Sequence, residues 1–159
     1  MNFEVIAVGH LRETYFSAAV EEYTKRLRAY GRICIRETPQ AYLPADPSPG
    51  DICRALEKEA DAIFPLLAGR AYRIALCVEG KQLSSEALSQ KLEQLATNGT
   101  DTVSFLIGSS YGLCERVKAA CDFKLSFSKM TFPHTLMRVL LTEQLYRACN
   151  LIGGGKYHK

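Results

Sequence analysis

Apolar residues along the chain follow two spacings, the alternation typical of buried strands and the three-to-four-residue repeat typical of amphipathic helices. The strand pattern occurs at residues 3–8, 33–35, 73–78, 103–107 and 124–127. The helical repeat occurs between and after them, at residues 16–27, 51–67, 84–95, 115–121 and 133–152. Because strands alternate with helices, the pattern predicts one α/β domain, residues 1–159, with a mostly parallel sheet flanked by helices.

Proline and glycine mark where several of these elements begin and end. Four prolines fall within residues 38–50, which predicts a loop there, and Asp51 is expected to cap the helix that follows. The Glu-Gly pair after Val78 is expected to close the third strand. Ligands of parallel α/β sheets bind beyond the carboxyl ends of the strands, so the loops after Val78, Ile107 and Phe127 are candidate binding loops.

Composition narrows the class of protein. Of the 159 residues, 47% are hydrophobic and 23% are charged, which is typical of a folded globular domain. No apolar run reaches the roughly 18 residues that a membrane helix needs, and the chain begins without a signal-like segment. The six cysteines form no C-x-x-C pair, and the three histidines show no metal-ligand spacing. We therefore expect a cytoplasmic protein with no disulfide framework, no metal and no membrane partner.

Charge is distributed unevenly along the chain. From Cys114 onward there are eight basic and three acidic residues, a net charge of +5, although the whole chain carries only +3. Two interpretations stay open. The region is either an ordinary solvated surface that happens to be basic, or a surface that faces phosphates, as in nucleic-acid-binding proteins.

The run Gly-Ser-Ser-Tyr-Gly at 108–112 matches the pattern G-x-S-x-G between a strand and a helix. In hydrolases this pattern holds a nucleophilic serine, here Ser110, and Asp122 with His134 or His158 could supply the acid and the base. The same glycines fit a turn at which the backbone approaches a ligand closely, and that interpretation needs no triad. The glycine patterns of dinucleotide-binding and P-loop sites do not occur.

Three residues near or after the start of the last helix are further candidates. His134 suits a structural hydrogen bond as well as a catalytic role, and Arg138 is favoured as a paired charge over a catalytic group. His158 lies in the C-terminal tail, away from any core that it would help to satisfy. Composition and spacing do not choose a reaction among these possibilities.

Longer motifs resemble one known family. The runs SFSKMTFPH at 126–134, MRV at 137–139, EQLYRA at 143–148 and the terminal YHK at 157–159 occur in the order and spacing of the RlmH family. The opening run IAVG at 6–9 and the total length are similar too. The family consists of SPOUT-superfamily methyltransferases that methylate N3 of a pseudouridine, position 1915, in 23S rRNA.

The resemblance implies a SPOUT-type (α/β knot) fold with a C-terminal trefoil knot, a homodimer, and action on the assembled ribosome. It also implies S-adenosylmethionine as the cofactor. Carried over by motif, the cofactor contacts would be Leu76, Gly108, Phe127, Ser128, Lys129, Met130, Thr131 and Phe132. These residues lie in or beside the three candidate binding loops.

The resemblance also suggests catalytic and RNA-binding residues. His158 would accept the proton from the target base, and Arg138 would stabilise charge on the base or on a phosphate. Tyr157 would pack against the target nucleotide or dock the tail. The candidates for contacts to rRNA phosphates are Arg116, Lys118, Lys124 and Lys156.

The chain departs from the family pattern at one position. The usual Ile-Gly-Gly is replaced by Ile-Gly-Ser, with Ser109 at the second glycine. If that position required a positive φ, Ser109 would be strained, but Gly108 and Gly112 remain and we expect cofactor binding to persist. Two other functions stay open, a small serine hydrolase that uses Ser110 and a non-catalytic ribosome-binding factor.

Overall fold

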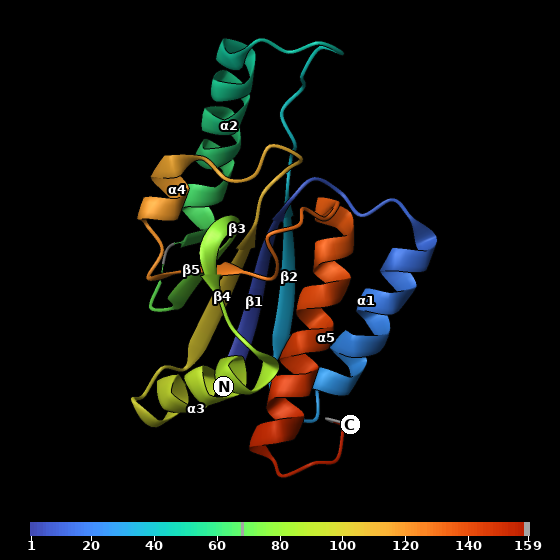
Figure 1. Cartoon of the computed structure of the whole chain (residues 1–159), viewed down its shortest axis with the longest axis vertical. Helices are drawn as coiled ribbons and strands as arrows, with labels where there is room; N and C mark the ends of the chain where they lie inside the picture. Colours follow the sequence, from blue (N-terminus) through green and yellow to red (C-terminus); the bar gives the residue numbers. More distant parts are fainter. Residues whose placement is uncertain (68, 158–159) are drawn as a thin grey trace.

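The computed structural model describes residues 1–67 and 69–157. Within them, a central five-stranded sheet has the order β2-β1-β4-β3-β5, and every strand pairing is parallel (Figure 1). The strands are β1 (Asn2–Val8), β2 (Ile33–Thr38), β3 (Tyr72–Gln82), β4 (Thr102–Ile107) and β5 (Phe123–Ser126). The helices are α1 (Thr14–Leu27), α2 (Pro49–Ile63), α3 (Ser85–Thr97), α4 (Glu115–Ala119) and α5 (His134–Ile152), with a 3-10 turn η1 (Phe64–Leu67) after α2. The predicted α/β fold with a parallel sheet flanked by helices is confirmed.

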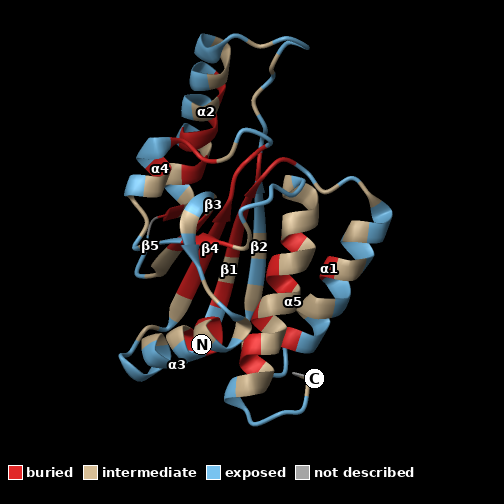
Figure 2. Cartoon of the chain, in the orientation of Figure 1, coloured by how far each residue is buried: buried red, intermediate tan, exposed pale blue. Residues whose placement is uncertain are grey.

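Helices cover both faces of this sheet. On one face α5 packs between α1 and α3, and on the other face α2 packs near α4 (Figure 1). Strand β1 shows how the sequence builds the two cores, because successive residues of a strand point to opposite faces. Phe3, Val5 and Ala7 join the core beneath α1, α3 and α5, whereas Ile6 and Val8 join the core beneath α2. Figure 2 shows that buried residues are concentrated in the central strands of the sheet.

The start of α2 differs from the sequence-based expectation. Ser48, not Asp51, caps the helix: its hydroxyl accepts a hydrogen bond of 3.2 Å from the Asp51 amide. The Asp51 carboxylate in turn accepts a hydrogen bond of 2.9 Å from the Ser48 amide. This reciprocal pair is a capping box, in which the acidic residue three positions inside the helix supports the cap.

Strand β3 continues four residues beyond the predicted end at Val78. Gly80 does not close the strand, because the chain resumes pairing with β5 after an irregularity between Leu76 and Lys81. A Cβ atom at Gly80 would lie 2.7 Å from the carbonyl carbon of Leu125. This glycine is therefore required for close backbone packing and not for a turn.

Within the part of the chain that the structure describes, no helix is both long and apolar enough to cross a membrane. The same residues contain no cluster of three or more histidine, cysteine or acidic side chains that could hold a metal ion.

Candidate active site

A cavity of about 330 Å³ lies at the carboxyl ends of β3, β4 and β5. Its walls come from residues 76–79 of β3, from the loops that follow β4 and β5, and from the first turn of α5. Of the residues carried over by motif, those that line it are Leu76, Gly108, Phe127, Ser128, Met130, Thr131 and Phe132. Lys129 is not among the lining residues. The volume falls in the range of small-molecule sites, roughly 300–1,000 Å³.

Gly108 allows the loop after β4 to fold back on itself. The loop closes through a hydrogen bond of 2.9 Å from the Gly112 amide to the Ser109 carbonyl, and Gly112 has a φ of +84°. A Cβ atom at Gly108 would overlap the Gly112 carbonyl oxygen. The turn that forms this wall of the cavity therefore needs glycine at 108 and favours glycine at 112.

Ser109 is not strained. Among the described residues only glycines have a positive φ, so the strain considered from the sequence does not arise. The Ser109 side chain instead points into the core, where its hydroxyl donates a hydrogen bond of 2.8 Å to Glu59 on α2. The other Glu59 oxygen accepts a hydrogen bond of 3.0 Å from the Ala41 amide in the proline-rich loop. Burial raises the pKa of Glu59, although both hydrogen bonds oppose the shift.

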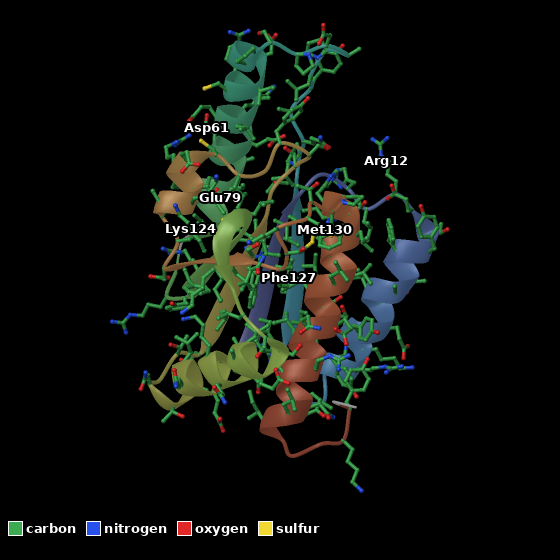
Figure 3. The ribbon with its side chains drawn as sticks, viewed as in Figure 1. Arg12, Asp61, Glu79, Lys124, Phe127 and Met130 are labelled. Atoms are coloured by element: carbon green, nitrogen blue, oxygen red, sulfur yellow. The ribbon has the colours of Figure 1, made fainter. Side chains whose placement is uncertain are left out.

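The loop after β5 presents apolar side chains to the cavity. Its backbone is held by two serines: the Ser126 hydroxyl donates to the Ser128 carbonyl (2.9 Å), and the Ser128 hydroxyl accepts from the Met130 amide (3.0 Å). Met130 is 73% exposed and Phe132 is 38% exposed at the cavity mouth. Phe127 and Met130 lie beside the N-terminal part of α5 in Figure 3. Exposed apolar side chains at a cavity mouth are typical of a ligand-binding edge.

Comparison with known proteins agrees with this geometry. A sequence model of the family described as predicted SPOUT methyltransferases matches residues 1–158. This chain belongs to the SPOUT methyltransferase family. A protein of Methanococcus maripaludis (strain C5) named ribosomal RNA large subunit methyltransferase H is 43% identical over 159 residues, with both chains fully covered. A Methanococcus vannielii protein of the same name is 44% identical, again over the full length of both.

Among solved structures, a probable methylase family protein from Haemophilus influenzae Rd KW20 shares the fold. The TM-score is 0.54 at 11% identity, and the match covers 99% of this chain and 70% of that one. At this identity the likeness concerns the fold alone. The SPOUT fold is thus supported by sequence and structure together, and the C-terminal knot stays a prediction.

The second chemistry considered from the sequence, a serine triad, is not assembled in this SPOUT methyltransferase. Ser110 is exposed after the carboxyl end of β4. Asp122 lies at the other end of the sheet, where its carboxylate accepts a hydrogen bond of 2.7 Å from the Arg73 amide at the start of β3. Because β3 and β4 are parallel, Ser110 lies at the carboxyl ends of the strands and Asp122 lies at their amino ends. G-x-S-x-G here describes a turn that lines the cavity.

Arg138 is buried, and both terminal nitrogens of its guanidinium bind groups of its own chain, whereas its buried Nε has no hydrogen-bond partner among the described residues. Its guanidinium pairs with Glu37 at the end of β2 and donates to the carbonyls of Val8 (3.0 Å) and Gly9 (2.6 Å) at the end of β1. Only 1% of Arg138 is exposed, and it does not line the cavity. These contacts agree with the sequence-based expectation that Arg138 is a paired charge. They hold the start of α5 against the ends of β1 and β2.

Tyr157 docks the C-terminal tail against the far end of α5. Its amide donates to Asn150 (3.0 Å), and its ring packs edge-on against Tyr146 with centroids 4.8 Å apart. The Arg147 guanidinium lies 4.8 Å from the same ring. A hydrogen bond to Tyr23 and burial raise the pKa of Tyr157 to about 12. His158, the candidate proton acceptor, lies outside the described residues.

The basic residues proposed for phosphate contacts fall into two groups. Arg116 pairs with Glu57 and Asp61, and Lys118 pairs with Glu79 and Glu115. Lys124 on the edge strand β5 and Lys156 in the tail are both exposed (Figure 3 labels Lys124). The second pair is therefore better placed to meet a polyanion.

Sequence reasoning missed Glu59, which connects the cavity turn to the proline-rich loop. A signal was present in the helical spacing. Ala55, Glu59 and Ile63 are four residues apart and all three are buried on α2. A carboxylate on the apolar stripe of a helix needs a specific partner, because an unpaired buried charge is costly.

Proposed function

We propose that this protein transfers the methyl group of S-adenosylmethionine to N3 of a pseudouridine in the 23S rRNA of the large ribosomal subunit, acting on the assembled ribosome. The observation that carries the proposal is the cavity at the carboxyl ends of β3, β4 and β5, which is lined by residues of the 126–134 run shared with the RlmH family and by Met137. The names of the two Methanococcus relatives support the choice of large-subunit rRNA.

The cavity suits S-adenosylmethionine in shape and chemistry. The Gly108 turn forms a backbone wall whose geometry any side chain at 108 would disrupt by clashing with the backbone of Gly112, and such a wall can hydrogen-bond a purine edge or a ribose. Leu76, Met130 and Phe132 supply apolar surface for the adenine ring. When bound, the cofactor supplies an electrophilic methyl group on a sulfonium centre.

The protein's own part in such a reaction is positioning and proton transfer. N3 of pseudouridine is an imide nitrogen, so its proton must leave before or as the nitrogen attacks. Holding two substrates in line contributes several kcal/mol to lowering a barrier. The loops around Gly108 and Phe127 would orient the donor, and a second surface must orient the base.

The position of the tail supports the homodimer that the resemblance implies. The cavity lies at the N-terminal end of α5, with His134 in its wall. Tyr157 is docked beside the C-terminal half of the same helix, against Tyr146 and Asn150, and the helical rise from His134 to Tyr146 is about 18 Å. His158 follows Tyr157 directly in sequence, so a catalytic role for it in this docked arrangement requires the tail of one subunit to serve the cavity of another.

Mixing a cofactor-site variant with a tail variant tests that arrangement, provided that His158→Ala alone lowers activity. Gly108→Ala removes the cofactor wall and His158→Ala removes the tail imidazole, and neither change touches the other site. If tails serve partner cavities, a mixture refolded together recovers activity that neither variant has alone. Without recovery, tail and cavity do not act across subunits.

The ribosome is the proposed partner because phosphate contacts alone would not direct the protein to one nucleotide. Exposed Lys124 and Lys156 would contact rRNA phosphates, and such contacts position a protein without reading sequence. Specificity would come from the shape of the assembled ribosome, and a ribosomal substrate places the protein in the cytoplasm.

The function is tested by incubating ribosomes and separate large subunits that lack the modification with the protein and isotopically labelled S-adenosylmethionine. The rRNA is digested and its nucleosides are identified by mass spectrometry. We expect labelled N3-methylpseudouridine from assembled ribosomes, and none with Gly108→Ala. Ribosome binding without transfer would favour the non-catalytic factor, and label on another nucleoside would change the target.

A further inference from the structure

A second cavity, of about 400 Å³, lies at the carboxyl ends of β1 and β2. It is separate from the cofactor cavity, but one residue, His134, lines both. The other residues that line it are Gly9, His10, Arg12, Glu13, Pro39, Gln40 and Thr135. Unlike the mouth of the cofactor cavity, with its exposed apolar side chains, this wall is made almost entirely of polar side chains and backbone.

Two polar groups in this wall have no partner. The Oε2 atom of Glu13 is buried and makes no hydrogen bond. The hydrogen bonds found among the described residues include none to the His134 ring, which is partly buried at the start of α5. The Glu13 oxygen has almost no accessible surface, so a ligand cannot reach it, whereas the partly exposed His134 ring is available to a ligand in this cavity.

The backbone brings these groups to one place. Gly9 has a φ of +85° and its amide donates to the Thr38 carbonyl (2.8 Å), which turns the chain sharply at the end of β1. A Cβ atom at Gly9 would lie 3.2 Å from Oε1 of Gln40 and 3.7 Å from Nε2 of His134. The Gln40 carboxamide and the His134 imidazole are therefore close enough to contact the same small ligand.

We propose that this second cavity receives the imide edge of the target nucleobase, and that His134 is the catalytic residue that accepts the N3 proton. The inference rests on the proposed function and names the substrate subsite for it. An imide edge presents an N–H between two carbonyl oxygens, and a carboxamide, an imidazole and a guanidinium offer the donors and acceptor that complement it. Because His134 lines both cavities, N3 of a base bound in the second cavity would lie next to the cofactor cavity.

Two bonds break and two bonds form in the proposed step. The N3–H bond breaks, its proton passes to Nε2 of His134, and the electron pair stays on N3. That pair forms the new bond to the methyl carbon as the carbon–sulfur bond breaks, with its electrons left on sulfur. The products are N3-methylpseudouridine, S-adenosylhomocysteine and a protonated imidazole that returns its proton to solvent.

The charges around His134 favour this role. Burial and the nearby Arg138 lower the pKa of His134, and Glu13 opposes the shift. The other charged or titratable groups at this end of the sheet are His10 and Arg12 in the loop after β1 and Glu37 on β2, which is held by Arg138 and His10. The imidazole is therefore neutral near pH 7 and able to accept a proton.

The test is the single-turnover rate of methyl transfer to ribosomes at saturating S-adenosylmethionine, measured against pH. For His134→Gln, which keeps a polar side chain that cannot titrate, we expect a rate lower by about 100-fold or more. Its rate should rise with pH up to the pKa of the imide itself, since solvent must then take the proton. The wild type should reach a plateau near neutral pH, and affinity for S-adenosylmethionine should change less than about 3-fold.

A second variant keeps the inference testable if His134→Gln is unstable. Gln40→Ala lies in an exposed loop, and we expect it to lower kcat/KM for ribosomes at least about 10-fold with unchanged cofactor affinity. Asp46→Asn in the same loop, outside the cavity, is the matched control and should match the wild type. A direct readout is the His134 imidazole resonance, which pseudouridine should shift and N3-methylpseudouridine should not.

The outcomes separate the two proposals. If the wild type is active and both His134→Gln and Gln40→Ala keep its rate and pH profile, the second cavity is not the substrate subsite. If His158→Ala loses the pH plateau and His134→Gln does not, the tail supplies the proton acceptor and this inference is overturned. A wild type that transfers no methyl group to rRNA overturns the proposed function and this inference with it.

Discussion

The hydroxyl of Ser109 and the carboxylate of Glu59 are 2.8 Å apart, and this hydrogen bond joins the turn of the cofactor cavity to helix α2. Both residues are buried, at 7% and 4% exposed. The second carboxylate oxygen binds the Ala41 amide, so Glu59 also holds the start of the proline-rich loop. A serine in place of the glycine usual in the family thus has a structural function in this chain.

Removal of the Ser109 hydroxyl should therefore destabilise the fold. Ser109→Ala leaves one oxygen of a buried carboxylate without its partner, and we expect the free energy of unfolding to fall by about 1–3 kcal/mol. Urea denaturation measures this change. Ser110→Ala is the matched control, because Ser110 is exposed and its loss should change stability by less than about 0.5 kcal/mol. Equal stabilities for the two variants would contradict the assigned role of Ser109.

The Ser110→Ala control also tests the hydrolase alternative. Because Asp122 is bound at the opposite end of the strands, we expect the protein to resist labelling by serine-directed phosphonates. Covalent labelling at Ser110 that the variant abolishes would revive a nucleophilic serine.

Glu59 should make stability depend on pH in an unusual direction for a carboxylate. Burial raises the folded-state pKa of Glu59 above its ordinary value of 4.5. The folded state therefore binds the proton more tightly than the unfolded state, and the stability from this group is present below the unfolded pKa and lost as pH rises through the folded pKa. Relative to Glu59→Gln, the wild type should gain stability as pH falls from 7 toward 4.5. Urea denaturation across that range tests this, and a difference that is flat or falls with acid would contradict it.

Arg138 should contribute more to the stability of the fold than to catalysis. It is 1% exposed and holds Glu37 and two strand-end carbonyls. Arg138→Met leaves those acceptors without a donor, and we expect a loss of about 3 kcal/mol in the free energy of unfolding. Glu37 should then titrate closer to its ordinary pKa, because the hydrogen bond and charge of Arg138 help hold it lower. Full stability with lost methyl transfer would instead support a direct catalytic role.

Ribosome binding should depend on Lys124 more than on Arg116. Lys124 is exposed, whereas Arg116 is paired with Glu57 and Asp61. We expect Lys124→Ala to weaken binding and to reduce the dependence of log affinity on log salt by about one unit per lost phosphate contact. Arg116→Ala should change the salt dependence less. Binding that does not respond to salt would exclude this electrostatic account.

The sequence was sufficient for the elements and the edge where ligands bind, because strand alternation and helical spacing are local properties. The predicted loops after Ile107 and Phe127 line one cavity together with residues 76–79, which are not a loop but part of β3. The sequence was less informative about Gly80, which ends no strand but allows close packing against Leu125. A glycine required by a neighbouring strand cannot be told from a turn glycine without the tertiary structure.

Side-chain partners were the least accessible part of the site. Arg138 and Glu37 are 101 residues apart, and Ser109 and Glu59 are 50 apart. The pairing of Arg138 with Glu37 depends on the strand order, which places the end of β2 beside β1 and brings α5 over both. His134 was recognised from the sequence as either structural or catalytic, and its position between two cavities, which supports the proposed catalytic role, required the tertiary structure.

The most direct test of the account is a calorimetric titration of the protein with S-adenosylmethionine, repeated with Gly108→Ala. The wild type should show saturable binding. The variant should remain folded by circular dichroism and lose binding, because its Cβ atom would occupy the turn against the Gly112 carbonyl. Equal binding by the two proteins would mean that the cofactor lies elsewhere. No binding by the wild type, with or without ribosomes, would contradict the proposed methyltransferase chemistry.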